Sequence, residues 1–233
     1  MKHCSFIFGM IVGLAPLAYG ADACGGVGVA IPDDSLPGVV VPIVVDAPGE
    51  LIDAVTVDLD ITHPWVGDLV VTLESPGGVV VSLLDRAGIP NTGFPGVFGC
   101  GGRDVLASFV DDASQDAETM CSTTAVPVIS GLVAPGSLLS AMDGGLADGV
   151  WLLTLSDRSA YDAGTLNSVC LQITTMPACS VDFTGDGELD IFDVFAFLDA
   201  FNAMDPGADF TGDTLYDIFD VFAFLDAFNA GCA

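Results

Sequence analysis

The chain has 233 residues, 52% of them hydrophobic, and its 32 Asp and Glu residues against four Lys and Arg residues give a formal net charge of −28. The hydrophobic content argues against a disordered chain. The charge excludes nucleic acid and anionic membrane surfaces as partners, because both repel a strongly acidic protein.

The first 20 residues have the features of an export signal. A short basic start is followed by an apolar run over residues 6–17, and small residues stand at Ala18 and Gly20. This order is typical of a signal peptide that is cleaved after Gly20. The apolar run is too short and too interrupted to span a membrane, and no later segment is long and uncharged enough to do so. We therefore expect a secreted protein, extracellular or at the cell surface, with no membrane span.

Between the signal and residue 174, the sequence predicts short strands with one buried face. Because apolar side chains alternate with polar ones and no helical period interrupts them, we expect an antiparallel β-sandwich with Trp151 in its core. The clearest alternation lies in residues 55–62, 69–74, 151–155 and 169–173.

Cysteines predict disulfides in this region and in the C-terminal one. Cleavage of the signal would leave six cysteines, and an even number in an exported chain favours disulfides over metal ligation. One pair brackets the C-terminal residues closely and a second flanks an acidic loop, although six cysteines allow 15 connectivities. The favoured pairs are Cys179 with Cys232, Cys100 with Cys121, and Cys24 with Cys170.

The C-terminal region contains an internal repeat. Residues 182–186 recur as 209–213 and residues 190–203 recur as 217–230, an offset of 27 residues (209 − 182). Each copy begins with a twelve-residue loop whose oxygen-bearing residues follow the spacing of a calcium loop. Solvated acidic turns that only aid solubility are the alternative, but both copies keep acids at positions 1, 5, 9 and 12. The predicted Ca²⁺ ligands are Asp182, Thr184, Asp186, Glu188, Asp190 and Asp193 in loop 1, and Asp209, Thr211, Asp213, Leu215 through its carbonyl, Asp217 and Asp220 in loop 2.

Position 6 distinguishes the two loops. Loop 1 has Gly187, which permits a sharp turn, whereas loop 2 has Thr214. We therefore expect the second site to be weaker or strained. Each loop leads into an apolar helix, and in the first helix the expected buried stripe leaves Phe192 and Phe197 as a candidate face for a partner. That stripe consists of Ile191, Val194, Phe195 and Leu198.

The paired loop-helix units with Asp at position 12 resemble a type I dockerin module, and residues 224–232 resemble the GC-type dockerin of bacterial exported proteins. Both loops depart from the EF-hand, because position 12 is not Glu and no amphipathic helix enters the loop. The resemblance implies calcium-dependent binding to a cohesin-like or other surface receptor.

The strand region resembles the P domain, or Homo B domain, that follows the catalytic domain of proprotein convertases. The resemblance implies an eight-stranded jelly-roll sandwich. A departure is Val169-Cys170, where the family usually has Trp. The stretches that carry the resemblance are 30–33, 57–63, 67–69, 74–78, 82–86, 109–113, 149–157 and 164–168. The expected organisation is a signal peptide at 1–20, a P-domain-like sandwich at 21–174, a linker at 175–178 and a dockerin-like module at 179–233.

Catalytic residues are scarce in this sequence. His63 is the one histidine outside the signal, and it is interpreted either as a base beside Asp68 or, preferably, as a loop residue packed by Pro64 and Trp65. We therefore expect no catalytic residues and a secreted, non-catalytic calcium-binding protein tethered through its C-terminal module. The alternative is an accessory component of an extracellular enzyme system, either subtilisin-like proteolysis or a polysaccharide-degrading complex.

A second calcium site is a weaker expectation for the sandwich. Its candidate ligands are acids at the ends of strands, in stretches that carry the P-domain resemblance. They are Asp68, Asp157 and Asp162.

Overall fold

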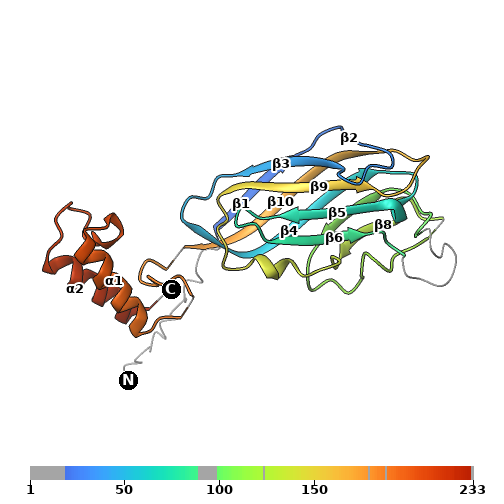
Figure 1. Cartoon of the computed structure of the whole chain (residues 1–233). Coiled ribbons are helices and arrows are strands. Elements are labelled where there is room, and N and C mark those ends of the chain that lie inside the picture. The colour runs from blue at the N-terminus through green and yellow to red at the C-terminus, as the bar shows by residue number, and fades with distance from the viewer. Residues whose placement is uncertain (1–18, 89–98, 123, 178, 187, 232–233) are drawn as a thin grey trace, which may run out of the picture.

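The structure is a computed structural model, and it describes residues 19–88, 99–122, 124–177, 179–186 and 188–231 (Figure 1). Two α-helices follow the strands, α1 (Ile191–Ala203) and α2 (Ile218–Ala230), and short 3₁₀ helices cover Val66–Asp68, Leu139–Met142 and Pro206–Ala208. The strands are β1 (Tyr19–Gly25), β2 (Val29–Ile31), β3 (Val39–Val45), β4 (Glu50–Thr62), β5 (Leu69–Glu74), β6 (Val80–Asp85), β7 (Val105–Phe109), β8 (Ile129–Val133), β9 (Gly149–Asp157) and β10 (Gly164–Pro177).

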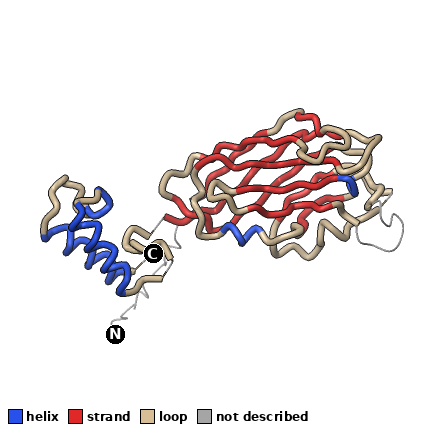
Figure 2. The backbone as a smooth tube through the Cα atoms, in the orientation of Figure 1, coloured by secondary structure: helices blue, strands red, loops and turns tan. Residues whose placement is uncertain are grey.

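The strands form two sheets, as Figures 1 and 2 show. One sheet has six strands in the order β1-β10-β4-β7-β8, with β2 also paired to β10, and the other has the order β3-β9-β5-β6. All named pairs are antiparallel except β7 with β8. The fold is therefore mostly β, with two sheets, as the sequence predicts.

The described residues contain ten strands rather than the expected eight. The 14-residue strand β10 pairs along one edge with β4 and along the other with both β1 and β2. Strand β1 has no apolar alternation, so periodicity does not reveal it. Its pairing with β10 brings Cys24 opposite Cys170, and a disulfide joins them.

The predicted alternation is confirmed in the core strands. Val57 and Ile61 of β4 are fully buried, whereas Asp58 and Asp60 are partly exposed on the other face. Trp151 is fully buried, and its indole N–H donates to the carbonyl oxygen of Ala147 at 3.0 Å. The sequence therefore assigns the correct face of β4 and β9 to the core.

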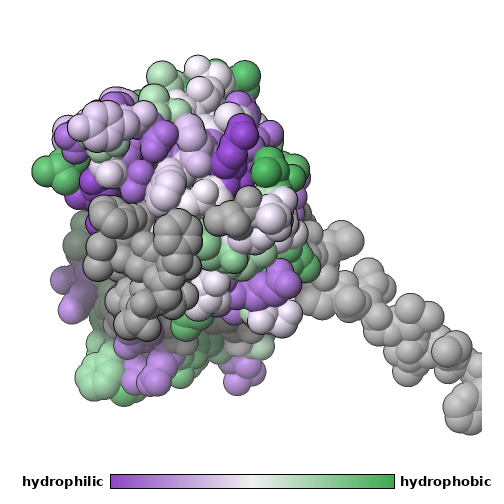
Figure 3. Space-filling view, turned by 90° about the vertical axis from the view of Figure 1, so that its right-hand side faces the viewer, coloured by the Kyte–Doolittle hydropathy of each residue, from purple (hydrophilic) through white to green (hydrophobic). Residues whose placement is uncertain are grey.

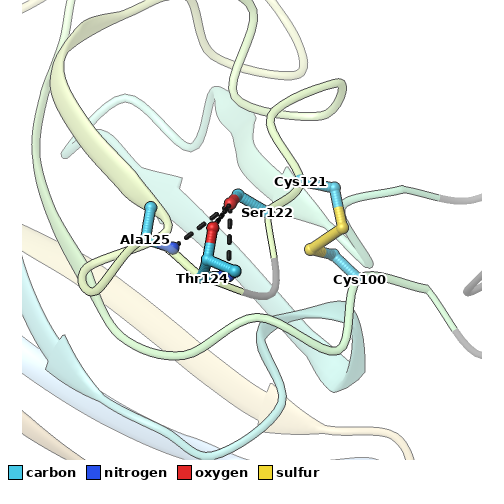
Figure 4. The surroundings of a disulfide bond; sticks show 5 residues. All are labelled: Cys100, Cys121, Ser122, Thr124 and Ala125. Atoms are coloured by element: carbon cyan, nitrogen blue, oxygen red, sulfur yellow. Dashed lines mark hydrogen bonds between the residues drawn. A yellow bond between two sulfur atoms is a disulfide. The ribbon is translucent and has the colours of Figure 1, made fainter.

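The structure describes both cysteines of a second disulfide and one cysteine of a third. Cys100 is bonded to Cys121, and the loop that follows is ordered by the Ser122 hydroxyl, which accepts the N–H groups of residues 124 and 125 (Figure 4). Cys179 is disulfide-bonded, and Cys232, its expected partner, lies outside the described residues. The pairing of Cys179 with Cys232 therefore stays a prediction.

The two C-terminal repeats share a hydrophobic cluster separate from that of the sandwich. Phe197 of α1 and Phe224 of α2 are fully buried, and their rings stack with centroids 4.0 Å apart and 1° between planes. Phe183 and Phe210, from the two loops, pack edge-on against this pair. The repeats thus bury their apolar faces against each other.

The buried stripe expected for α1 is wrong at three of its four residues, whereas the fourth, Val194, is partly buried against the repeat cluster. Ile191, Phe195 and Leu198 are 55%, 56% and 43% exposed, whereas Phe197, which the expectation left outside the stripe, is buried. Because α1 is apolar nearly all round, several stripes satisfy the helical period. The aromatic side chains of the loops and of α2 select the buried face.

Candidate metal centres

The carboxylate at position 12 organises each repeat loop. Asp193 is fully buried, and its Oδ1 accepts from both the N–H and the hydroxyl of Thr184, at 3.0 and 2.9 Å. Its Oδ2 accepts from the N–H of Asp190 at 2.9 Å, which completes a capping box at the start of α1. These hydrogen bonds, that from Asp190 first, lower the pKa of Asp193 below its usual value.

Loop 2 repeats this arrangement. Asp220 is also fully buried and accepts from the N–H and hydroxyl of Thr211 at 3.0 and 2.9 Å, and from the N–H of Asp217 at 2.9 Å. The pKa of Asp220 is lowered by the hydrogen bond from Asp217 first and by those from Thr211 next. Both loops therefore keep an ionised carboxylate at the point where the loop joins its helix.

The remaining acids accept hydrogen bonds from the loop backbone. Asp182 accepts from the N–H of Gly185 at 2.8 Å, and Asp209 accepts from the N–H of Thr214 at 2.8 Å. At position 5, Asp186 accepts from the N–H of Glu188, and Asp213 in loop 2 accepts from the N–H of Leu215. At position 9, the acids cap the helices by accepting from residues 192 and 219.

The donor chemistry suits calcium, but the described side chains do not form a closed metal shell. Carboxylates, hydroxyls and backbone carbonyls are the hard oxygen ligands that Ca²⁺ takes. In the part of the chain that the structure describes, no group of three or more His, Cys, Asp or Glu side chains is arranged to hold a metal ion. Calcium binding by these loops is therefore argued below as a proposal.

Thr214 has a left-handed backbone. Its φ is +67°, a conformation that β-branched residues rarely adopt. This agrees with the expectation that position 6 requires glycine. Gly187, its counterpart in loop 1, lies outside the described residues.

In the sandwich, His63 lies in the loop directly after β4, as expected, and forms a buried pair with Asp157. His63 is fully buried, and its Nε2 lies 3.2 Å from Oδ2 of the fully buried Asp157. Nδ1 accepts the N–H of Trp65 at 3.1 Å, so the ring proton is on Nε2 and is donated to Asp157. The pair joins the end of β4 to the end of β9, and thus one sheet to the other.

Asp68 lies beside this pair. It is nearly buried, and its Oδ1 is 3.9 Å from Nη2 of Arg86. Burial, followed by the negative charge of Asp157, raises the pKa of Asp68 to about 6, although the charge of Arg86 acts in the opposite direction. The negative charge of Asp162 also raises the pKa of Asp68, by less than that of Asp157 does. Of the three candidate ligands in the sandwich, Asp68 and Asp157 are thus the two that are buried near each other.

Sequence reasoning missed the pairing of His63 with Asp157. The two residues are 94 positions apart, and the one available signal was that both follow or end a predicted strand. With both ring nitrogens engaged and no exposed surface, His63 stabilises the fold in this arrangement.

Figure 3 views the sandwich from the right-hand end of Figure 1, where hydrophilic and hydrophobic residues are intermixed.

The described helices include none that is long and apolar enough to cross a membrane.

Comparison with known proteins supports the P-domain resemblance. The family model of the proprotein convertase P-domain matches residues 52–95. The calcium-dependent proteases of Nostoc sp. and Trichormus variabilis are 28% and 27% identical over 125 residues. That alignment covers 52% of this chain but 14% of each relative.

Solved structures with a similar chain trace are also proteases. The serine protease of Aeromonas sobria superposes with a TM-score of 0.39, 17% identity and coverage of 69% of this chain and 28% of the protease. The structure of this protease in complex with its chaperone superposes with a TM-score of 0.40 and 16% identity, and the match covers 70% of this chain and 28% of the protease. The chain thus spans a minor part of the length of each of these proteins.

Proposed function

We propose that this chain is a secreted, non-catalytic calcium-binding protein in which a P-domain sandwich is tethered through its C-terminal repeats to a surface or an extracellular complex. The observation that carries the proposal is the duplication of the whole loop-helix unit. Both copies have the same hydrogen bonds at the position-12 carboxylate and the same capping box. A solubilising acidic turn would not require this arrangement twice.

In this proposal, calcium is held by the acids at positions 1, 5, 9 and 12, by the threonine hydroxyl at position 3 and by the residue at position 7, which is Glu188 in loop 1 and Leu215 through its carbonyl in loop 2. When bound, the ion neutralises carboxylates that otherwise repel one another. Asp193 and Asp220 are already ionised and oriented by hydrogen bonds, so each provides a fixed ligand at the start of its helix. The relatives called calcium-dependent proteases support calcium as the cofactor.

The tethering face consists of the apolar side chains that the module leaves exposed. Phe195 is 56% exposed in α1, and its counterpart Phe222 is 54% exposed in α2. Exposed apolar surface repeated on both helices is typical of a protein-binding face. By its resemblance to dockerins, a cohesin-like receptor is the proposed partner. The proposed face is formed by the exposed apolar residues of α1 and α2, which are Ile191, Phe192, Phe195, Leu198, Ile218, Phe219, Phe222 and Leu225.

A capture experiment tests this proposal. The full-length chain is immobilised and exposed to the envelope fraction of the producing cell, with calcium or with a chelator. We expect a cohesin-like receptor to be captured with calcium and lost with the chelator. The double variant Phe195→Asp and Phe222→Asp should abolish capture, whereas Val40→Asp, at a comparably exposed apolar site on the sandwich, should not. Capture that is independent of calcium or unaffected by the double variant would contradict the proposal.

The second candidate function is an accessory role in an extracellular enzyme system. The P-domain match and the proteases among the similar proteins favour a subtilisin-like protease over a polysaccharide-degrading complex. The purified chain should not hydrolyse casein or polysaccharides by itself. Hydrolysis that is abolished by His63→Ala, with the fold retained, would overturn the non-catalytic assignment.

A further inference from the structure

The outer face of the six-stranded sheet contains a shallow pocket that the proposed tether does not use. Its volume is about 230 Å³, and its lining comes from β4, β7, β8 and β10. Asp58 and Asp60 of β4 are among its lining residues, two residues apart and therefore on the same face. On β8, Gly131 lines the pocket, and a Cβ added there would meet no atom within 4 Å.

Neutral side chains hold both carboxylates in place. Asp58 accepts hydrogen bonds from the Ser108 hydroxyl and, at 3.0 Å, from the side-chain amide of Gln172. Asp60 accepts from the side-chain amide of Asn167 at 2.8 Å. Five strand residues on three neighbouring strands thus form two polar groups, one around each carboxylate, in which hydroxyl and amide groups are the donors.

These two groups leave mainly acceptors for a ligand. Both N–H groups of the Asn167 amide are engaged, one with Asp60 and the other with the Thr62 hydroxyl at 2.9 Å, so neither is left to a ligand. The carboxylates keep further lone pairs, because each oxygen can accept more than one hydrogen bond. A ligand that fits must therefore donate several hydrogen bonds from one small region.

Apolar surface borders the same pocket. Leu106 of β7 is 56% exposed and lies among the lining residues, opposite Asp60 in the strand register. Cys170, on the other side, is part of the disulfide to Cys24. The lining therefore combines hydrogen-bond acceptors with flanks that can contact C–H groups.

The geometry points to a saccharide-binding site on this face of the sandwich. Sugar hydroxyls would donate to Asp58 and Asp60, and the C–H face of the ring would pack on Leu106. The volume lies below the roughly 300 to 1,000 Å³ of sites for drug-sized ligands, which suits one sugar ring of a chain lying along the open sheet. The lining residues are not aromatic, so the affinity depends on hydrogen bonds to the two carboxylates. This inference is independent of the proposed tether.

Affinity electrophoresis of the full-length chain tests the site, with native gels that contain xylan, mannan, laminarin or hydroxyethylcellulose. At least one of these neutral polysaccharides should retard the parent chain. Asp60→Ala should weaken the retention by about tenfold or more, because a hydrogen bond to a charged group is lost. Asp46→Ala replaces an exposed acid outside the pocket and should leave retention unchanged.

Asp60→Asn serves as the second variant, since it keeps the shape of the side chain and removes its charge. It should melt at the parent temperature and bind more weakly than the parent. Migration that none of the four polysaccharides retards, or retention that is equal in parent, Asp60→Ala and Asp60→Asn, would overturn the inference. Binding of a lysine-rich peptide without binding of any polysaccharide would also overturn it, because the site would then be one for cations.

Discussion

The carboxyl of Asp68 is almost fully buried beside the charge of Asp157, and this raises its pKa to about 6. The unfolded chain has the ordinary value of 3.8, so between these values the folded state holds a proton that the unfolded state has lost. By linkage, the contribution of Asp68 to the free energy of unfolding is highest below pH 4 and decreases as the pH rises to 6. The size of the decrease is about 2 to 3 kcal/mol.

Asp68→Asn should remove this decrease, because the amide does not titrate. Urea unfolding of the full-length chain at several pH values from 4 to 8 measures the difference between variant and parent. Asp46→Asn, at an exposed site, is the matched control and should follow the parent. Parallel pH profiles for Asp68→Asn and the parent would show that Asp68 does not titrate in this range.

The elements differ in how far the sequence predicts them. The faces of β4 and β9 follow from period-two alternation, which is a local property of the chain. The face of α1 does not, because apolar residues on nearly every side give the helix no single preferred stripe, and Phe197 is selected by Phe224 and the loop aromatics. Strand β1 is not predicted from local alternation either, because it is defined by its pairing with β10, which lies about 150 residues further along the chain.

The stack of Phe197 on Phe224 should stabilise both helices together. Phe197→Ala should destabilise the module by about 3 to 5 kcal/mol, as truncations of buried aromatic residues do. Because so small a core has little stability to lose, both helices should become protease-sensitive and exchange their amide hydrogens rapidly. Hydrogen exchange of the full-length chain measures this helix by helix.

Phe195→Ala provides the control within the same helix, because Phe195 is 56% exposed and outside the buried cluster. It should leave exchange in α1 and α2 close to that of the parent. If Phe195→Ala and Phe197→Ala accelerated exchange equally, the buried face of α1 would be assigned wrongly. If Phe197→Ala affected α1 alone, the two repeats would not share a core.

At the scale of the whole molecule, stability is distributed unequally between the two hydrophobic clusters. The sandwich cluster contains the large majority of the buried side chains, and two disulfides cross it or lie beside it. The repeat cluster is small and is surrounded by loops dense in carboxylates, within a chain of net charge −28.

Under the calcium proposal, repulsion among these acids opposes folding of the repeats, and the ion removes this repulsion. Calcium should therefore slow hydrogen exchange in residues 182–230 and leave the sandwich nearly unchanged.

The two loops should contribute unequally to this response. Extracellular sites of this type bind at about 10⁻⁴ to 10⁻³ M, and a hundredfold excess over the dissociation constant adds about 2.7 kcal/mol per site. Thr214 holds a left-handed φ of +67° in loop 2, and under the calcium proposal this strain should weaken that site. Asp186→Ala should therefore reduce the calcium-dependent stabilisation more than Asp213→Ala, and Thr214→Gly should increase the response of loop 2. Calorimetric titration of the full-length variants with calcium measures each effect. Equal losses from the two Asp variants, together with no gain from Thr214→Gly, would show that position 6 does not control calcium affinity.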